Sequence, residues 1–388
     1  MSEQIDRRGF IRLGTTGMAA VGLASAGGLS AFLAACSSGS SSTAASGVSG
    51  ASASGASGVA APTFGSVSFQ QSWINNDEFS GEYLADTRGY YLKEGFSSAS
   101  LLTGGPNVDQ DAVVQSGKAF IGVSSPDITS AAITQGADLI IVGAQYQKNP
   151  FAIMSMAKTP ILNPQGMIGK KIGVQSGNQA VWNAFLKANS IDPSKIDEVP
   201  VQFDPTPLTV GTVDGWFSFI TNEPNLLKSK GFDTYTFLLN DYNYPLVSET
   251  YMVQTSALTT GRAQLKAFLR AEIRGWHDSI ADPSAGPYLA VTKYGKSLGL
   301  DLGEQTLESM AQNKLILTPD TIANGIFTIT PESIAKSIGT LALGGTTITA
   351  PKLFDTSVID EIYQENPELL PSPAPGSASP PATTTTTA

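Results

Sequence analysis

The stretch Ser72–Gly81, SWINNDEFSG, decides how the rest of the chain is interpreted. It follows the apolar run Val67–Phe69, which predicts a short strand, and it supplies an indole, two carboxamides and two carboxyl groups. Ligands of open α/β sheets bind outside the carboxyl ends of the strands. We therefore expect Trp73, Asn76 and Phe79 to form the first wall of a small-molecule site, with core packing or helix capping as the structural alternative for each.

Apolar runs that predict strands alternate with segments that predict helices along most of the chain. Such alternation is typical of a parallel or mixed sheet with helices on both faces. The chain has 388 residues, which is too long for one compact core. The predicted strands are Val67–Phe69, Ala99–Leu102, Ala119–Val123, Leu139–Val142, Ile172–Val174, Val199–Phe203 and Val213–Phe219.

The pattern restarts after Gly169 and returns to the first unit near Ser248–Gln254, before a largely helical remainder. A chain that leaves one α/β unit, builds another and returns predicts two lobes with the ligand between them. We place lobe I at residues 64–157 and 250–370 and lobe II at residues 158–249. The crossings are expected near Met156–Pro164 and Asp241–Glu249.

The amino-terminal end predicts export. The pair Arg7-Arg8 precedes a mildly apolar run, Gly14–Phe32, and the sequence LAAC ends at Cys36. A charged start with a modest apolar core is a secretory signal, and the paired arginines indicate the twin-arginine route. We expect residues 1–35 to be a lipoprotein signal and Cys36 to carry the lipid that holds the protein at the outer face of the cell membrane. The alternatives are a membrane-spanning anchor and a free thiol.

The segments that flank the folded part are of low complexity. Residues 36–63 are mainly Ser, Gly and Ala and predict a flexible tether, and residues 371–388 predict a disordered tail. The net charge of −10 argues against a nucleic-acid partner. Cys36 is the one cysteine and His277 the one histidine, so no cysteine-based metal site or Ser–His–acid set is expected. We expect no cofactor and a monomer.

Polar residues follow several predicted strands. Ser124 and Ser125 come after AFIGV, and hydroxyl groups at a helix start can hold polar ligand atoms. Tyr146 follows LIIVGAQ. The same arrangement recurs in lobe II, where we expect contacts from Ser176, Asn178 and Gln179. The alternative for the serines is ordinary helix capping.

The last predicted wall follows the strand that begins at Val213. Asp214, Trp216, Asn222 and Glu223 are the candidates, because an aromatic ring with a carboxylate suits an amino-substituted heterocycle. The alternatives are a structural role for Asp214 near the sheet and a helix-start role for Glu223.

These residues resemble a known family. The run WINNDEFSGEYLADTRGYYLKEGF is similar to the opening signature of importer substrate-binding proteins for thiamine pyrimidine precursors and aliphatic sulfonates. The further similar segments, in order, are Val114–Ala119, Met167–Val174 and Gly211–Gly215. The resemblance implies a type II periplasmic-binding-protein fold and a role as the ligand-delivering component of an ABC importer, with a membrane permease as partner.

The resemblance also implies a range of ligands. We expect a flat nitrogen heterocycle such as a thiamine-precursor pyrimidine, because the predicted mouth motifs are aromatic and acidic and contain no Lys or Arg. Sulfonate or taurine, nitrate and riboflavin are the alternatives within the same role. Some relatives are pyrimidine synthases that use a Cys-rich motif and an active-site His. This chain has no Cys after Cys36, and His277 lies in a helical stretch remote from the mouth motifs, so we expect no enzyme. A sensory lipoprotein without an importer is the remaining alternative.

Overall fold

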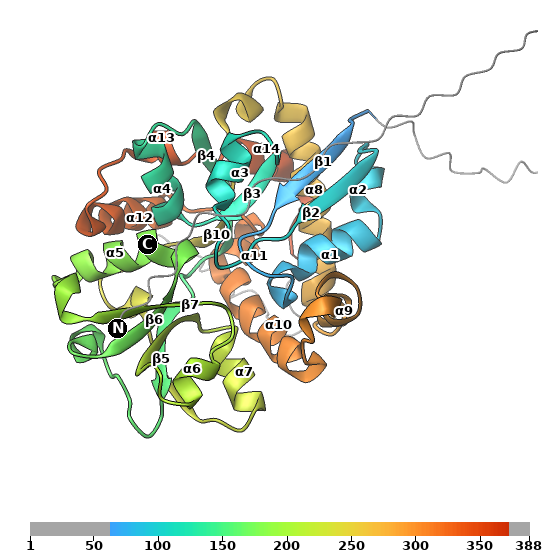
Figure 1. The fold of residues 1–388 in the computed structure, drawn as a ribbon. Helices are drawn as coiled ribbons and strands as arrows, with labels where there is room; N and C mark the ends of the chain where they lie inside the picture. The colour runs from blue at the N-terminus through green and yellow to red at the C-terminus, as the bar shows by residue number, and fades with distance from the viewer. Residues whose placement is uncertain (1–62, 372–388) are drawn as a thin grey trace, which may run out of the picture. The chain divides into compact units, whose positions relative to one another are not determined.

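The strand that precedes Ser72–Gly81 is part of a five-stranded sheet with the order β2-β1-β3-β10-β4 (Figure 1). The computed structural model describes residues 63–371. In this first sheet, β1 is parallel to β2 and β3, whereas β10 is antiparallel to β3 and β4. The strands are β1 (Ser66–Gln70), β2 (Ser98–Leu102), β3 (Ile121–Ser124), β4 (Leu139–Tyr146) and β10 (Ser248–Gln254).

A second five-stranded sheet has the order β7-β6-β8-β5-β9. Here β6 is parallel to β7 and β8, and β5 is antiparallel to β8 and β9. Each sheet therefore has one antiparallel strand in the fourth position. The strands are β5 (Phe151–Met156), β6 (Lys171–Gln175), β7 (Asp197–Val201), β8 (Gly215–Phe219) and β9 (Thr234–Leu238).

The two sheets confirm the predicted α/β, two-lobe fold. The chain passes from β4 of the first sheet through residues 147–150 into β5 of the second, and it returns through residues 239–247 into β10. Strand β5 was not predicted, and it lies in the second sheet before the crossing expected near Met156–Pro164. The predicted signal, Cys36, the tether up to residue 62 and the tail from residue 372 lie outside the described residues.

Helices cover the sheets. Residues 80–93 form two short helices instead of one, because Gly89 between them adopts a left-handed conformation with φ 68°. The α-helices are α1 (Ser80–Thr87), α2 (Tyr90–Lys93), α3 (Gln110–Gln115), α4 (Pro126–Thr134), α5 (Gln179–Ala188), α6 (Thr206–Thr209), α7 (Glu223–Ser229), α8 (Arg262–Ala281), α9 (Ala285–Leu289), α10 (Leu302–Ile316), α11 (Pro319–Asn324), α12 (Pro331–Gly344), α13 (Ala350–Leu353) and α14 (Ser357–Glu365).

Short helical turns connect several elements. A π-helix, η7 (Ala290–Tyr294), follows α9 directly. The 3-10 turns are η1 (Asp77–Phe79), η2 (Pro164–Met167), η3 (Ser176–Asn178), η4 (Pro193–Lys195), η5 (Leu239–Asp241), η6 (Thr255–Leu258), η8 (Lys296–Leu298) and η9 (Pro367–Leu369).

Helix α8 packs closely against α1, the helix that follows Ser72–Gly81. A Cβ atom at Gly275 would lie 2.1 Å from the carbonyl oxygen of Gly81, so the contact requires glycine there. Helix α12 contacts both α5 and α4, and α13 and α14 contact β4. The helical remainder therefore supports the first sheet and also reaches the second-sheet helix α5. Among residues 63–371, no helix is both long and apolar enough to cross a membrane.

Candidate functional site

A cavity lies where strand ends of the two sheets meet, and it holds about 560 Å³ of atom-free space, part of it open to solvent. The parallel strands β1, β2, β3, β6 and β8 reach it with their carboxyl ends, as expected for α/β sheets. The antiparallel strands β5 and β10 reach it with their amino ends. The lining residues are Ser72, Trp73, Glu78, Gly105, Val108, Gln110, Ser124, Ser125, Ile128, Phe151, Gln175, Gly177, Asn178, Phe217, Ser218, Phe219, Asn222, Glu223 and Glu249.

Trp73 is held at the cavity by the loop after β2. The amide of Gly104 donates to the carbonyl oxygen of Trp73 at 2.9 Å. A Cβ atom at Gly104 would lie 2.4 Å from the carbonyl oxygen of Gln71, so only glycine permits this approach. The loop after β2 thereby fixes the backbone that carries the indole.

Hydroxyl and carboxamide groups line the part of the cavity next to β3. Gln110 lies at the start of α3, and its Nε2 is 3.4 Å from Ser124 Oγ. Ser124 donates to Asp111 Oδ2 at 2.5 Å, and Ser125 donates to Asp127. Burial raises the pKa of Asp111 to about 6 and raises the pKa of Asp127. Both serine hydroxyls are therefore engaged with acids behind the cavity wall.

Glu78 and Glu249 form an acidic pair bridged by Ser72. Ser72 Oγ lies 3.0 Å from Glu78 Oε1 and 2.9 Å from Glu249 Oε2. Burial raises the pKa of Glu78 to about 7. Burial, followed by the charge of Glu78, raises the pKa of Glu249 well above its usual range. Glu249 has φ 46°, a left-handed conformation that a non-glycine residue adopts at a cost, and such residues cluster at functional sites.

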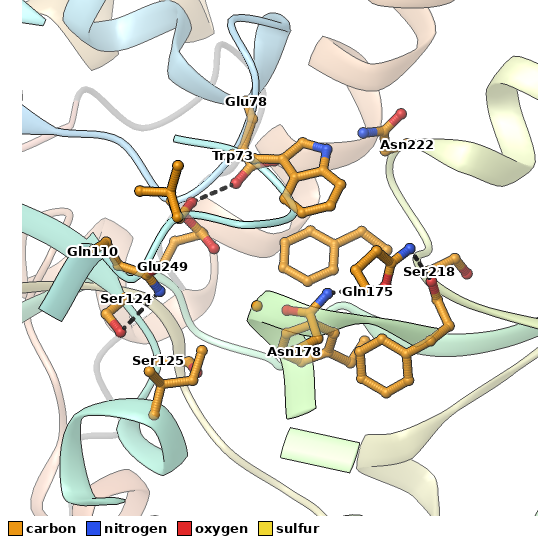
Figure 2. Close-up of a pocket in the computed structure, with 18 of the residues that line it drawn as sticks. Trp73, Glu78, Gln110, Ser124, Ser125, Gln175, Asn178, Ser218, Asn222 and Glu249 are labelled. Atoms are coloured by element: carbon orange, nitrogen blue, oxygen red, sulfur yellow. Dashed lines mark hydrogen bonds between the residues drawn. The ribbon is translucent and has the colours of Figure 1, made fainter. Parts of the chain in front are cut away.

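The second sheet contributes aromatic rings and carboxamides. Phe151 stacks edge-on against Phe219, with ring centroids 4.5 Å apart, and Phe217 lies 4.9 Å from Phe151. Gln175 donates through Nε2 to the carbonyl oxygen of Phe217 at 3.0 Å and accepts from Asn178 Nδ2 at 3.1 Å. Figure 2 shows Gln175, Asn178 and Ser218 across the cavity from Glu249, Gln110 and Ser124.

Glu223 begins α7, next to Asn222. Its Oε2 accepts from the amide of Phe219 at 2.9 Å. Burial raises the pKa of Glu223 to about 8, and the charges of Glu78 and Glu304 act in the same direction. Three acids thus line the cavity, whereas its lining within the described residues contains no Lys, Arg or His. The described residues also hold no group of three or more His, Cys, Asp or Glu arranged to bind a metal ion.

Six of the predicted site residues line the cavity: Trp73, Ser124, Ser125, Asn178, Asn222 and Glu223. They follow predicted strands whose carboxyl ends lie together. The structure therefore brings together residues that are up to 150 positions apart in the sequence.

Three predicted residues near the first sheet lie outside the cavity. Asn76 is buried and donates to Glu308 Oε1 at 2.8 Å. Phe79 is fully buried in the hydrophobic core, which is the structural alternative considered for it. Tyr146 is also buried, and its hydroxyl donates to Gln312 at 2.7 Å. Helix α10, which carries Glu308 and Gln312, satisfies these polar groups.

Four predicted residues near the second sheet also lie outside the cavity lining. Trp216 is fully buried, because neighbouring residues of a strand face opposite sides and Phe217 takes the cavity side. Asp214 is exposed and accepts from the amide of Lys171 at 2.9 Å. Gln179 donates to Asn183 at 3.1 Å. Ser176 donates to the carbonyl oxygen of Pro106 at 2.8 Å, beside the cavity.

Sequence reasoning missed several lining residues, above all Phe151 and Glu249. Both lie at the start of an antiparallel strand. The amino end of an antiparallel strand lies at the same sheet edge as the carboxyl ends of its parallel neighbours. A search limited to the carboxyl ends of predicted strands therefore overlooks them. Two further lining residues lay at positions that the sequence marked: Glu78 lies within Ser72–Gly81, and Gln175 directly follows the predicted strand Ile172–Val174.

A comparison with models of protein families shows to which family this chain belongs. A family model described as NMT1/THI5 like matches residues 76–285, which is more than half of the 388 residues. The chain belongs to the NMT1/THI5-like family. The match begins after β1 and Trp73, and it includes η1 and most elements of both sheets.

Several known proteins are similar to this chain in sequence or in fold. The riboflavin-binding protein RibY of Chloroflexus aurantiacus is 26% identical over 237 residues, which are 58% of this chain and 65% of RibY, so the match spans slightly less than two thirds of that protein. The aliphatic sulphonate binding protein SsuA of Escherichia coli has a TM-score of 0.54 at 16% identity over 73% of this chain and 87% of SsuA. The nitrate-binding protein NrtA of Synechocystis PCC 6803 has a TM-score of 0.56 at 13% identity over 80% of this chain and 92% of NrtA. Both structures have the fold of periplasmic binding proteins.

Proposed function

We propose that this chain is the extracytoplasmic solute-binding component of an ABC importer and that it binds a flat nitrogen heterocycle, such as a thiamine-precursor pyrimidine. The observation that carries the proposal is the composition of the cavity. It combines four aromatic side chains, Trp73, Phe151, Phe217 and Phe219, with three acids and no cationic side chain among the lining residues.

Each component of the cavity suits such a ligand. Aromatic faces offer a large contact area to a flat ring. Carboxyl and carboxamide oxygens accept hydrogen bonds from ring or exocyclic N–H groups. A sulfonate or nitrate ion would instead meet Glu78, Glu223 and Glu249, each of which repels an anion when it is ionised. The ligand chemistry therefore favours the heterocycle over the anions.

The importer role is supported by the family and by the fold. Ligand binding in a two-lobe protein favours the closed state over the open one. We place the hinge in residues 147–150 and 239–247, the two segments that join the sheets. The family membership and the lack of a Cys-rich motif in this chain favour binding without catalysis.

The membrane attachment proposed for Cys36 has its own test. Replacing Cys36 with Ser should move the protein from the membrane fraction to the soluble fraction of the producing cell, without changing ligand binding by the purified protein. Equal membrane association of the variant and the parent would contradict the lipid anchor.

Riboflavin is the second candidate ligand. The observation in its favour is the 26% identity with a riboflavin-binding protein. Riboflavin is also flat and rich in nitrogen, so the aromatic lining of the cavity fits it as well. The two candidates differ in size, and a direct comparison separates them.

The test is a thermal-shift panel on the protein with pyrimidines, thiamine, riboflavin, taurine and nitrate. A ligand that binds the folded state raises the melting temperature as RT ln(1 + [L]/Kd) requires. We expect shifts with an aminopyrimidine or riboflavin and none with taurine or nitrate. Shifts with taurine or nitrate alone would overturn the ligand class.

Trp73→Ala tests the site within the same panel. The substitution should abolish most of the shift, because a truncated aromatic anchor typically costs at least about 2 kcal/mol of binding. Tyr288→Ala is the matched control, since Tyr288 is exposed and lies outside the cavity. An undiminished shift in Trp73→Ala would show that the ligand binds elsewhere.

A further inference from the structure

We propose that Glu78, Ser72 and Glu249 hold a single shared proton, and that this proton-bearing group is the polar anchor for a basic nitrogen heterocycle, so that ligand affinity falls when the proton is lost. The inference rests on the proposed function in one respect, namely that the ligand of the cavity is a nitrogen heterocycle.

The geometry of the hydroxyl requires the proton. Ser72 Oγ is within hydrogen-bond distance of both acids, at 3.0 Å from Glu78 and 2.9 Å from Glu249. A serine hydroxyl carries one proton and can donate it to only one of them. If both acids were ionised, Ser72 would donate to one of them, and its oxygen would face a carboxylate oxygen of the other with no proton between the two. A protonated Glu249 that donates to Ser72, which donates to Glu78, satisfies both contacts.

The surroundings of the pair favour a proton over two negative charges. Glu78 is 2% exposed and Glu249 is 3% exposed. Burial raises the pKa of both groups. The titratable groups around the pair are acids and phenols. Among the described residues, the one cation that acts on any of them is Lys230, whose charge lowers the pKa of Glu304. The acids and phenols are Asp77 on η1, Glu82 and Tyr83 on α1, Tyr146 on β4, Glu223 on α7, and Glu304 and Glu308 on α10.

Glu223 and Gln110 also offer polar atoms to a ligand in the cavity. Glu223 and Gln110 are each more than nine-tenths buried and line the cavity with the acid pair. Among the described residues, Oε1 of each side chain has no hydrogen-bond partner, although its second polar atom has one. Both side chains line the cavity, so these oxygens can accept hydrogen bonds from the N–H or O–H groups of a ligand or from water. Figure 2 shows Gln110 and Glu249 on the same side of that cavity.

An aminopyrimidine edge matches the acid pair. It presents a ring nitrogen that accepts a hydrogen bond beside an exocyclic N–H that donates one. The protonated carboxyl donates to the ring nitrogen, and a carboxylate oxygen accepts from the N–H. If the ligand is basic enough, the same proton moves to the ring nitrogen. In either case the complex keeps one proton. The hydrogen bond from Glu249 to Ser72 is exchanged for one to the ligand, while Ser72 still donates to Glu78.

The expected consequence is a specific pH dependence of affinity. Above the pKa of the free ligand's ring nitrogen, and while the pair keeps its proton, affinity is independent of pH. Once the free protein loses the proton at higher pH, affinity falls about tenfold per pH unit, because binding must take one proton up.

The test is titration calorimetry with 4-amino-5-hydroxymethyl-2-methylpyrimidine from pH 5 to pH 9. We expect the tenfold slope in the parent protein and a flat profile in Glu249→Gln, which keeps a neutral hydrogen-bonding group at that position. Glu198→Gln is the control, since Glu198 is exposed and is not among the residues that line the cavity. A pH-independent affinity of the parent, or equal slopes in the parent and Glu249→Gln, would overturn the proposal.

A second measurement needs no ligand. In the protein labelled with ¹³C at the glutamate carboxyl carbons, the signal lost in Glu249→Gln should have the shift of a protonated carboxyl at pH 6, and Ser72→Ala should change it. A shift typical of ionised carboxylates for both Glu78 and Glu249 would overturn the shared proton. Failure of every panel compound to bind would instead count against the proposed function, and the carboxyl signals would still decide the proton.

Discussion

The second-sheet segment, Phe151–Leu238, and the remainder of the described chain, which carries the first sheet, differ in the number of acidic side chains that they bury. Among residues 63–371, nine acids are buried outside the second-sheet segment, and Glu223 is the one buried acid between Phe151 and Leu238. None of these acids forms a salt bridge among the described residues. The nine are Asp77, Glu78, Glu82, Asp111, Asp127, Glu249, Glu272, Glu304 and Glu308.

The partners of these acids explain how the fold tolerates them. Tyr251 donates to Glu82 at 3.1 Å and Tyr91 donates to Glu272, so a hydroxyl group supplies a hydrogen bond to each of these two acids. The core around the second sheet is instead apolar, with clusters such as Met154, Trp216 and Leu227. The comparison indicates that protonation acts mainly on the first-sheet part, whereas the second-sheet part, apart from Glu223, offers an aromatic surface for flat groups.

The largest expected effect is on stability. Burial raises the pKa of Glu82 to about 7 and raises that of Glu272 well above its usual range, with the Glu82 charge as the next cause. Groups whose pKa is raised by folding stabilise the fold below the unfolded value, about 4.3, and this stabilisation is lost as pH rises through the folded value. The free energy of unfolding should fall by at least about 3 kcal/mol between about pH 5 and pH 8.

Denaturant unfolding at several pH values checks this. Glu272→Gln should reduce the pH dependence, because it removes one titrating group and keeps an acceptor for Tyr91. Glu368→Gln, at an exposed site, should leave it unchanged. Stability that rises from about pH 5 to pH 8 would refute the contrast between the two parts.

The next effect concerns the aromatic surface of the second sheet. Phe219 is half-buried, lines the cavity and packs edge-on against Phe151. Phe219→Ala should weaken binding of the panel's best ligand about tenfold or more at every pH, because a ring face is lost but no titrating group. Titration calorimetry at two pH values measures this, and Phe232→Ala, on an exposed ring outside the cavity, is the control. A loss confined to one pH would contradict the separation of roles.

The smallest effect concerns a contact between the loop after β2 and the start of α5. Ser176 donates to Pro106 and lies 2.8 Å from Asn107 Oδ1, and the amide of Gly177 donates to Pro106 at 2.8 Å. Ser176→Ala should speed ligand dissociation a few-fold, since one partly exposed hydrogen bond contributes about 1 kcal/mol. Stopped-flow dissociation measures this, with Ser194→Ala as the control at a distant exposed serine. An unchanged rate would show that the contact does not help to retain the ligand.

The strand positions could be predicted because most strands are short apolar runs between helices. Strand β5 escaped prediction for a physical reason: Phe151–Met156 follows β4 after only four residues, and its sequence does not reveal that it pairs with β8 and β9. Strand β9, TYTFL, was also not predicted; it is short, lies at the edge of the second sheet and buries Phe237 alone among its five residues.

The site was predictable where parallel strands end. Ser124, Asn178 and Glu223 follow such strands and line the cavity. Glu249 lies at the start of a strand whose antiparallel direction depends on pairing with distant residues, so the local sequence carries no sign of it. Trp216 and Asp214 were selected for residue type, but the alternation along β8 and the hydrogen bond to Lys171 determine where they lie.

The most direct test of the central claim is a crystal structure of the protein with the panel compound that raises the melting temperature most. We predict the ring of that compound in the cavity, in contact with Trp73 and Phe219, with its N–H edge within hydrogen-bond distance of Glu249 or Glu78. A ligand bound outside this cavity, or one that places an anionic group against the acid pair, would contradict the account.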